Sequence, residues 1–315
     1  MPTTKSPRKG TLQFTPRKKS KRQYPRVRNW SHKKEAKPLG FFGYKVGMTR
    51  VVAINENKNA HTVGEETAVP ATIVECPPMK MYSARFYKNE EEALKLKKEI
   101  FFKTDKNLQK KTNLSKDNSK ELDKIDVEEY DSITVTIYTQ PSKAGVSKKK
   151  PELLEVGLGG KKQEKLDYIK ESHNKEIDIE SIFSTEDLVD IHAITKGKGN
   201  QGPVKRFGIG LKNHKSEKGR RNPGSLGPWN RQQHIMWRVS HAGQTGYHQR
   251  TEYNKQILEI SADTEKRGKH FHKYGNIKSK YVLLHGSIPG PTKRTIVMST
   301  PSREKKNKHK LSIQE

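Results

Sequence analysis

Three glycines in the stretch HAITKGKGNQGPVKRFG, residues 192–208, have a spacing that could bind a dinucleotide. Gly197, Gly199 and Gly202 follow the pattern G-x-G-x-x-G, which lets a pyrophosphate approach the start of a helix. Such a site also needs a helix after the glycines and an acidic residue about 20 positions on, for the ribose. Pro203 follows at once, the next residues favour strand and turn, and no acid stands at that distance. We therefore expect no cofactor and no helix here, but a glycine-rich strand exit that lies against phosphates, with a plain flexible turn as the alternative.

Three histidines recur seven residues apart further along the chain, which could suggest a metal. His234, His241 and His248 have no carboxylate or cysteine nearby to complete a ligand set, and Gly243 and Gly246 interrupt any helix that would align the rings. We expect polar contacts to RNA from these histidines and no metal. Since the acids lie mostly elsewhere, no catalytic triad or carboxylate pair can be argued, and the chain is not expected to be an enzyme.

The charge distribution identifies the kind of partner. The chain has 64 Lys and Arg against 35 Asp and Glu, a formal net charge of +29, yet residues 85–186 are neutral, with 21 of each sign. Residues 1–34 contain 12 Lys and Arg and no acid, residues 196–250 contain 12 and only Glu217, and residues 266–315 contain 13 against two acids. Such an excess needs a polyanionic partner or a solvated tail. Nucleic acid is favoured over a membrane because the basic stretches are not amphipathic helices with an apolar face.

The longest basic stretch between strands, residues 205–250, favours RNA. A loop of this length inside a compact domain is normally functional or disordered. Trp229, Trp237 and Tyr247 alternate there with arginines, and aromatic planes beside guanidinium groups suit the unstacked bases of RNA loops. A DNA-binding motif would show a recognition helix or zinc ligands. A basic DNA-compacting chromatin or nucleoid protein is the alternative.

Two further features concern the compartment. No apolar run approaches the ~18 residues of a membrane-spanning helix, and the basic N-terminus lacks the apolar core of a secretory signal. The single cysteine, Cys76, can form no intrachain disulfide and is expected to be a small buried hydrophobe. We expect a reduced, soluble, cytoplasmic protein with neither a membrane nor a small-molecule partner.

Short Val- and Ile-rich runs, punctuated by glycine and proline, must position the basic segments. Such runs are typical of strands, and several of them without helical patterns between them argue for a small antiparallel barrel or sandwich. We expect strands within residues 38–56, 68–78, 188–195, 255–261, 279–289 and 293–299.

The neutral segment between the two sets of strands is predicted to be an inserted α/β domain. Residues 88–103, KNEEEALKLKKEIFFK, are expected to form a helix, with Asn89 as N-cap, Glu92 three residues later, and acids before lysines as the helix dipole favours. The further expectations are a strand at 131–141, a helix at 161–175 and a loop at 103–124.

Residues 183–208, FSTEDLVDIHAITKGKGNQGPVKRFG, resemble the signature of the universal large-subunit ribosomal protein number three family ("L-three"). The length and the basic N-terminal arm resemble the archaeal form. The similarity continues through residues 12–30, 39–51, 224–254 and 285–294.

The resemblance implies a mainly β fold: a six-stranded translation-protein-type β-barrel with an inserted α/β domain and long basic extensions. It implies a structural constituent of the large ribosomal subunit that binds 23S-type rRNA, supports its assembly and lies beside other large-subunit proteins. Its central finger would reach toward the peptidyl transferase centre. The domains expected are an arm at 1–37, the barrel at 38–83 and 186–300 with the finger at 205–250, the insert at 84–185 and a tail at 301–315.

The candidate rRNA-binding residues are cations, aromatics and histidines of these segments. In the arm they are Arg8, Lys9, Arg17, Lys18, Lys19, Arg22, Arg26, Arg28 and Trp30. In the barrel and the glycine turn they are Lys45, Lys196, Lys198, Arg206, Lys293 and Arg294. In the finger they are His214, Lys218, Arg220, Arg221, Trp229, Asn230, Arg231, His234, Trp237, Arg238, His241, Tyr247, His248 and Arg250, with Gly227, Pro228 and Trp229 at the tip.

Overall fold

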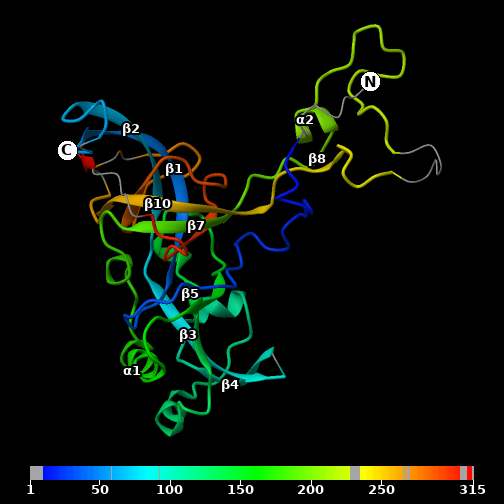
Figure 1. Ribbon diagram of the computed structural model, residues 1–315. Coiled ribbons are helices and arrows are strands. Elements are labelled where there is room, and N and C mark those ends of the chain that lie inside the picture. Colours follow the sequence, from blue (N-terminus) through cyan, green and yellow to red (C-terminus); the bar gives the residue numbers. More distant parts are fainter. Residues whose placement is uncertain are drawn as a thin grey trace. The chain divides into compact units, whose positions relative to one another are not determined.

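The computed structural model divides the chain into two compact units (Figure 1). The first unit comprises Met1–Arg22 and Ile194–Gln249, and the second comprises Gln23–Ala193 and Arg250–Glu315. The structure describes residues 10–57, 59–91, 93–227, 235–264, 266, 268, 270–305 and 311–313.

Six strands, almost wholly within the second unit, pair into a closed ring. Their order is β1-β2-β11-β10-β7-β12, and β12 pairs back onto β1. All six overlap segments in which the sequence predicts strands, although β10 begins at Gln249 rather than near residue 255. The prediction of a mainly β chain is confirmed. A short seventh strand, β13 (Leu311–Ile313), pairs with the far end of β1. The ring strands are β1 (Gly40–Asn55), β2 (Glu66–Glu75), β7 (Leu188–Ile194), β10 (Gln249–Ser261), β11 (Tyr281–His285) and β12 (Thr295–Ser299).

Strand β11, one of the shortest strands of the ring, is buried on both of its faces. In β11, Val282 and Leu284 belong to one hydrophobic cluster, whereas Tyr281 and Leu283 belong to another. Because successive side chains of a strand point to opposite faces, this strand is covered on both sides, which explains its continuous apolar run. Cys76 is buried in the first of these clusters, as the sequence predicts.

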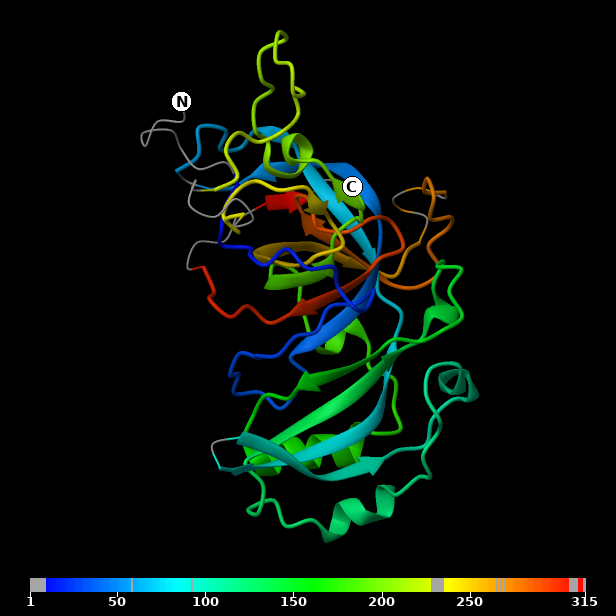
Figure 2. The same cartoon turned by 90° about the vertical axis from the view of Figure 1, so that its right-hand side faces the viewer.

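A second sheet in the same unit has four antiparallel strands in the order β4-β3-β5-β6. Helix α1 (Lys162–Ser172) packs against it through Leu166 and Ile169 (Figure 2). The predicted strand at 131–141 and helix at 161–175 are confirmed. The strands are β3 (Met79–Glu90), β4 (Ala93–Phe101), β5 (Ser132–Thr139) and β6 (Leu153–Gly157), and the 3-10 helices are η1 (Lys106–Lys110), η2 (Ser119–Lys124), η3 (Pro141–Lys143) and η4 (Ile179–Ser181).

The predicted helix over residues 88–103 is wrong. This segment is the end of β3, a turn at Glu91 with positive φ, and strand β4. The acids and lysines that resemble a helix dipole pair instead across the turn: Lys97 lies 2.5 Å from Glu90, and Lys95 lies 2.8 Å from Glu91. Pairing with β3 overrides the helical propensity of the segment. The predicted loop at 103–124 contains η1 and η2.

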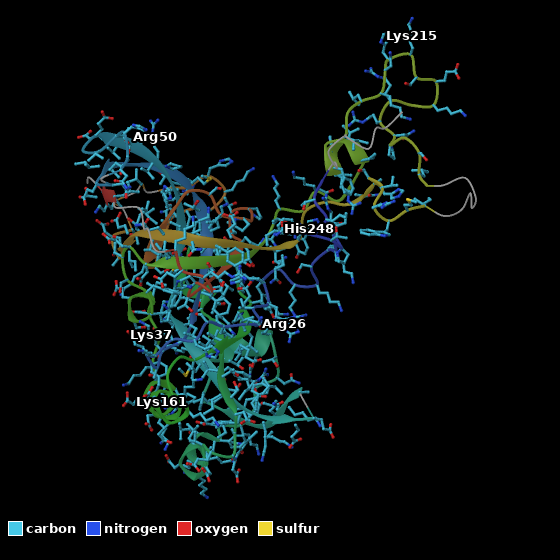
Figure 3. The ribbon with its side chains drawn as sticks, in the orientation of Figure 1. Arg26, Lys37, Arg50, Lys161, Lys215 and His248 are labelled. Atoms are coloured by element: carbon cyan, nitrogen blue, oxygen red, sulfur yellow. The ribbon has the colours of Figure 1, made fainter. Side chains whose placement is uncertain are left out.

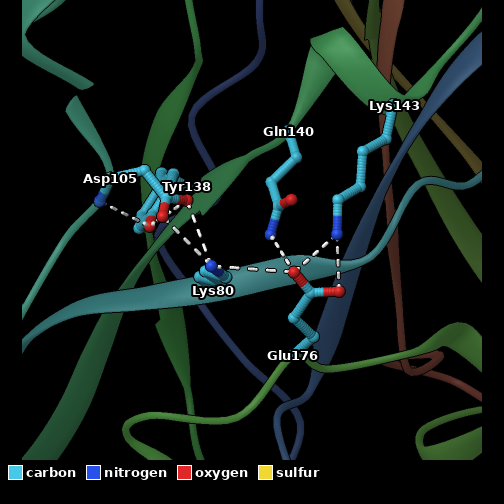
Figure 4. Close-up of polar contacts among 6 residues, drawn as sticks. All are labelled: Lys80, Asp105, Tyr138, Gln140, Lys143 and Glu176. Atoms are coloured by element: carbon cyan, nitrogen blue, oxygen red, sulfur yellow. Dashed lines mark hydrogen bonds and ion pairs between the residues drawn. The ribbon is translucent and has the colours of Figure 1, made fainter. Parts of the chain in front are cut away.

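A network of polar side chains fastens the connections around this sheet (Figure 4). Glu176 accepts hydrogen bonds from Lys143 at 2.6 and 2.7 Å and from Gln140 at 3.2 Å. Lys80 lies 3.6 Å from Glu176 and donates to both oxygens of Asp105, at 3.1 and 3.2 Å. Each charged group therefore has a partner of opposite sign, and the network joins β3, the end of β5 and two loops.

His192 links three ring strands and gives the fold a pH dependence. Its Nδ1 lies 2.9 Å from the hydroxyl of Thr251, and its Nε2 lies 3.0 Å from that of Ser299. Burial lowers the pKa of His192 below 6.5, more than the nearby Asp190 raises it. Since the unfolded chain binds this proton more tightly, the contribution to stability is complete above about pH 6.5 and is lost as the pH falls toward the lowered folded-state pKa.

When the pH is lowered from about 7.5 to about 5.5, the free energy of unfolding should decrease less in His192→Gln than in the parent protein. Urea-induced unfolding at the two pH values measures this difference. His61→Gln, at an exposed position in the β1–β2 connection, should keep the pH dependence of the parent. Equal losses for His192→Gln and the parent would contradict the assignment.

Candidate nucleic-acid interface

The glycine-rich turn organises the first unit. After Gly199, which has φ of 69°, β8 (Asn200–Gln201) pairs with β9 (Gly243–Gln244). Helix α2 (Pro203–Phe207) then begins directly after Gly202. The expectation that no helix follows the glycines is wrong. Proline lacks a backbone N–H, but the N–H groups in the first turn of a helix have no partner within the helix, so proline is tolerated there. With five residues, α2 is little more than one turn.

The backbone of the turn is held by the strand that returns along it. The amide of Lys198 donates to the carbonyl of Thr245 at 2.9 Å, and the amide of Thr245 donates to that of Gly199 at 2.8 Å. Gly246 comes next, with φ of 72°, and a Cβ at this position would overlap the carbonyl oxygen of Lys196. Only glycine fits this close approach.

Gly246→Ala should therefore open the turn, whereas Gly202→Ala should be tolerated, because φ of Gly202 is −66° and no atom lies within 4 Å of the added methyl. Strain and overlap of this kind cost about 2 kcal/mol or more. Hydrogen exchange at the Lys198 and Thr245 amides should accelerate about 30-fold in Gly246→Ala. Unchanged protection there would contradict the role assigned to Gly246.

Two arginines from distant parts of the chain share one aromatic ring in the first unit. The guanidinium of Arg17 lies 4.2 Å from the centre of the Phe207 ring, and that of Arg206 lies 5.1 Å from it. Arg17 also donates to the carbonyl of Arg206 at 3.0 Å, and Arg206 donates to those of Gln244 and His241 at 3.2 and 2.9 Å. Desolvation, and secondarily the charge of Arg17, lowers the pKa of Arg206. Arg206, predicted to bind rRNA, thus also fixes the local fold.

The first unit has almost no acid to neutralise these cations. Residues 1–22 contain 8 Lys and Arg, residues 194–249 contain 11, and Glu217 is the single acid in both segments. Positive charge gathered at this density is compensated when a polyanion binds and releases its counterions.

The backbone of the arm is tied to the end of the finger. The amide of Ser20 donates to the carbonyl of Tyr247 at 2.8 Å, and Nδ1 of His248 lies 2.8 Å from the carbonyl of Lys18. The ammonium of Lys19 lies 6.0 Å from the centre of the Tyr247 ring. Tyr247 and His248, predicted as RNA contacts, therefore hold Lys18 and Lys19 in place. His248 and His241 both contact backbone carbonyls, the latter that of Met236 at 3.2 Å.

The finger presents its cations to the solvent, as Lys215 illustrates in Figure 3. Its outer turn is closed by the amide of Lys212, which donates to the carbonyl of Arg220 at 3.0 Å. Trp237 has 71% of its surface exposed, the largest exposed aromatic surface among the described residues. Exposed as well are the predicted contacts Lys196, Lys198, His214, Lys218, Arg220, Arg221 and Arg238, and Gly227 is partly exposed. The predicted contacts Arg8, Lys9, Pro228, Trp229, Asn230, Arg231 and His234 lie outside the described residues.

In the second unit, two predicted contacts serve the fold as well. Trp30 packs against Gly40 and Gly157, where an added Cβ would lie 2.7 Å from the indole. Lys45 is buried, and its ammonium donates to the carbonyls of Ile288 and Gly290 at 2.5 and 3.0 Å. Burial lowers the pKa of Lys45. Arg26, Arg28 and Lys293 are exposed, Arg250 and Arg294 are partly buried, and Arg22 of the first unit is exposed.

Sequence reasoning missed Phe207 and the stretch Gly243–Gln244. The position of Phe207 directly after Arg206 was the signal in the sequence that could have indicated its role. Nothing in the sequence indicates that the carbonyl of Gln244 accepts a hydrogen bond from Arg206, because this contact depends on the pairing of β8 with β9.

A family model described as Ribosomal protein L3 matches residues 1–314. The chain belongs to the ribosomal protein L3 family. The L3 family comprises structural ribosomal proteins, and this chain is accordingly no enzyme. The resemblance seen in the sequence, with its archaeal character, is confirmed. Among the residues that the structure describes, no helix is long and apolar enough to cross a membrane.

Three archaeal relatives cover nearly the whole chain. It is 43% identical over 310 residues to "Large ribosomal subunit protein uL3" of Archaeoglobus fulgidus, which spans 95% of this chain and 93% of the relative. The protein of the same name from Methanothermobacter thermautotrophicus is 43% identical over 306 residues, or 93% and 90% of the two chains. That of Methanopyrus kandleri is 40% identical over 314 residues, or 96% and 86%.

Proposed function

We propose that the chain is a structural constituent of the large ribosomal subunit and binds large-subunit rRNA directly. The observation that carries this proposal is the first unit, where one acid accompanies the 8 Lys and Arg of residues 1–22 and the 11 of residues 194–249. RNA phosphates supply the missing negative charge, and exposed aromatics such as Trp237 supply stacking surfaces. The names of the archaeal relatives, which are large-subunit proteins, support the same assignment.

The closed ring of six strands supports a translation-protein-type β-barrel as the anchor of the protein. The four-stranded sheet with α1 would be the inserted α/β domain, and its neutral composition suits a lobe that does not face phosphates. The domains proposed are the arm at 1–37, the barrel at 38–83 and 186–300 with the finger at 205–250, the insert at 84–185 and the tail at 301–315. Strand β3, which belongs to this sheet from Met79 on, supports an insert that starts a few residues earlier.

The resemblance to the family further supports a role of the finger near the peptidyl transferase centre, with Gly227-Pro228-Trp229 at its tip. The arm and the finger would support assembly by neutralising phosphates inside folded rRNA, beside neighbouring large-subunit proteins. We assign no specific role to Asn230, the residue after the tip tryptophan.

Sedimentation of cell extract through a sucrose gradient at moderate salt tests the proposal. We expect the chain to travel with the large subunit and to leave that fraction after ribonuclease treatment. A chain that remains at the top of the gradient, or that travels with DNA and is released by deoxyribonuclease, would overturn the assignment.

A further inference from the structure

We propose that the outer face of the β1–β2 hairpin is a docking surface for another protein of the large subunit. The hairpin face consists of Met48, Arg50, Val52, Ala68 and Pro70. Its partner would present apolar side chains and one carboxylate, opposite Arg50. This inference rests on the proposed function, because it places the partner in the same particle.

The strand register puts these five side chains on one face. Arg50 pairs with Pro70, and Val52 pairs with Ala68. Met48 lies two residues before Arg50 in β1 and is therefore on the same face. Side chains of directly opposed residues point to the same side of a sheet. The opposite side of the hairpin, with Val51 and Val69, is buried in the second hydrophobic cluster. The hairpin therefore has one covered face and one open face.

The open face is apolar where an antiparallel ribbon is normally polar. Met48 is 53% exposed and Val52 is 44% exposed, and Ala68 and Pro70 are exposed as well. Antiparallel sheets with one buried face usually alternate apolar inward and polar outward residues. Contiguous apolar surface on a soluble protein marks an interaction site more often than a chance arrangement does.

Arg50 stands in the middle of this apolar surface, on β1 (Figure 3). Among the residues that the structure describes, none forms a hydrogen bond or an ion pair with its guanidinium. A guanidinium covered by apolar groups requires an acceptor, and a carboxylate matches its two parallel N–H groups. This requirement fixes the chemistry of the partner at the centre of the hairpin face.

The charge of the hairpin argues for a protein rather than for rRNA. Residues 47–70 contain Arg50 and Lys58 against Glu56, Glu65 and Glu66, a net charge of −1 in a chain of +29. Segments that bind phosphates need an excess of cations, and acids at the hairpin end would repel them. The net charge of the hairpin is thus opposite in sign to the net charges of the arm and the finger.

A single photoreactive label can identify the neighbour of the hairpin face. Cys76, the only native cysteine, is buried, and burial raises the pKa of its thiol, so an introduced surface cysteine reacts selectively. Glu66→Cys places a benzophenone at the rim, since Glu66 pairs with Ile54 on the same side and is exposed. The labelled chain is reconstituted with rRNA and total large-subunit proteins, and the particle is isolated on a gradient and irradiated.

We expect an adduct that survives ribonuclease and contains a second large-subunit protein. Adding Arg50→Glu should lower its yield at least ~5-fold, since a reversed charge opposite a carboxylate repels it. An adduct to rRNA, no adduct, or a protein adduct unaffected by Arg50→Glu would overturn the inference.

Leu211→Cys provides the matched control. Leu211 is 52% exposed in the basic finger and should give an rRNA adduct under the proposed function. Particles in which Leu211→Cys labels rRNA but Glu66→Cys fails would refute the docking surface alone. A chain that does not enter the particle, or a finger label that does not reach rRNA, would refute the proposed function instead.

Discussion

Raising the salt concentration from 50 to 200 mM should weaken binding of the free chain to naked large-subunit rRNA by on the order of 10³–10⁵-fold. This is the response expected if ~6–10 phosphates release their counterions on binding. The basic residues of the first unit are numerous enough to contact that many phosphates, because residues 194–249 alone contain 11 Lys and Arg. Fluorescence anisotropy of labelled rRNA fragments over a salt series measures the slope.

Variants distinguish this mechanism from a general effect of salt on the fold. Replacing both Arg220 and Arg221 by glutamine should lower the slope of log K against log salt by roughly 1–2. Lys162→Gln, on α1 of the neutral lobe, should leave both affinity and slope unchanged. A flat salt response of the parent protein would refute phosphate neutralisation as the source of affinity.

Glu75→Leu should destabilise the second unit by at least about 3 kcal/mol. Glu75 is completely buried at the end of β2 and accepts hydrogen bonds from the hydroxyl of Tyr274, the amides of Gly145, Lys278 and Ser279, and the Ser279 hydroxyl. Removing the carboxylate leaves several buried donors without an acceptor, and each costs about 1–3 kcal/mol. Burial and the adjacent carboxylate raise the pKa of Tyr274, so it remains a donor at neutral pH.

Equilibrium unfolding in urea measures this loss. Ser279→Ala removes the hydroxyl donor but keeps the backbone contact, and should cost only about 1 kcal/mol. Glu128→Leu, at an exposed site, should be nearly neutral. If Glu75→Leu unfolds at the same urea concentration as Glu128→Leu, the buried carboxylate does not hold these loops.

The ring strands were predictable because each carries its own signal. Runs such as LVDIHAIT and YVLLH are short and mostly apolar, and burial on both faces leaves little room for polar positions. The segment 88–103 was not predictable in this way. Its acids and lysines fit a helix equally well, and only the pairing with β3, which is a contact outside the segment, decides for β4.

The candidate interface was predictable as a charge pattern and not as a geometry. An excess of cations is visible in the composition of the arm and of the finger. Arg17 and Arg206 share the Phe207 ring although they are 189 positions apart in the sequence. This arrangement depends on the tertiary fold. For the same reason Trp30 and Lys45 could not be distinguished by sequence from exposed contacts, although both are engaged in packing or carbonyl contacts.

The tie between Lys18 and His248 has a consequence for protein synthesis, since 230 positions separate the two residues. At about 5–20 residues per second, a ribosome needs roughly 12–46 s to add the partner after the arm has been made. Throughout that interval the carbonyl of Lys18 lacks its His248 partner, and the contact of Arg17 with the carbonyl of Arg206 also forms only after most of the chain has been made. This part of the basic arm can then meet a polyanion before the protein is complete.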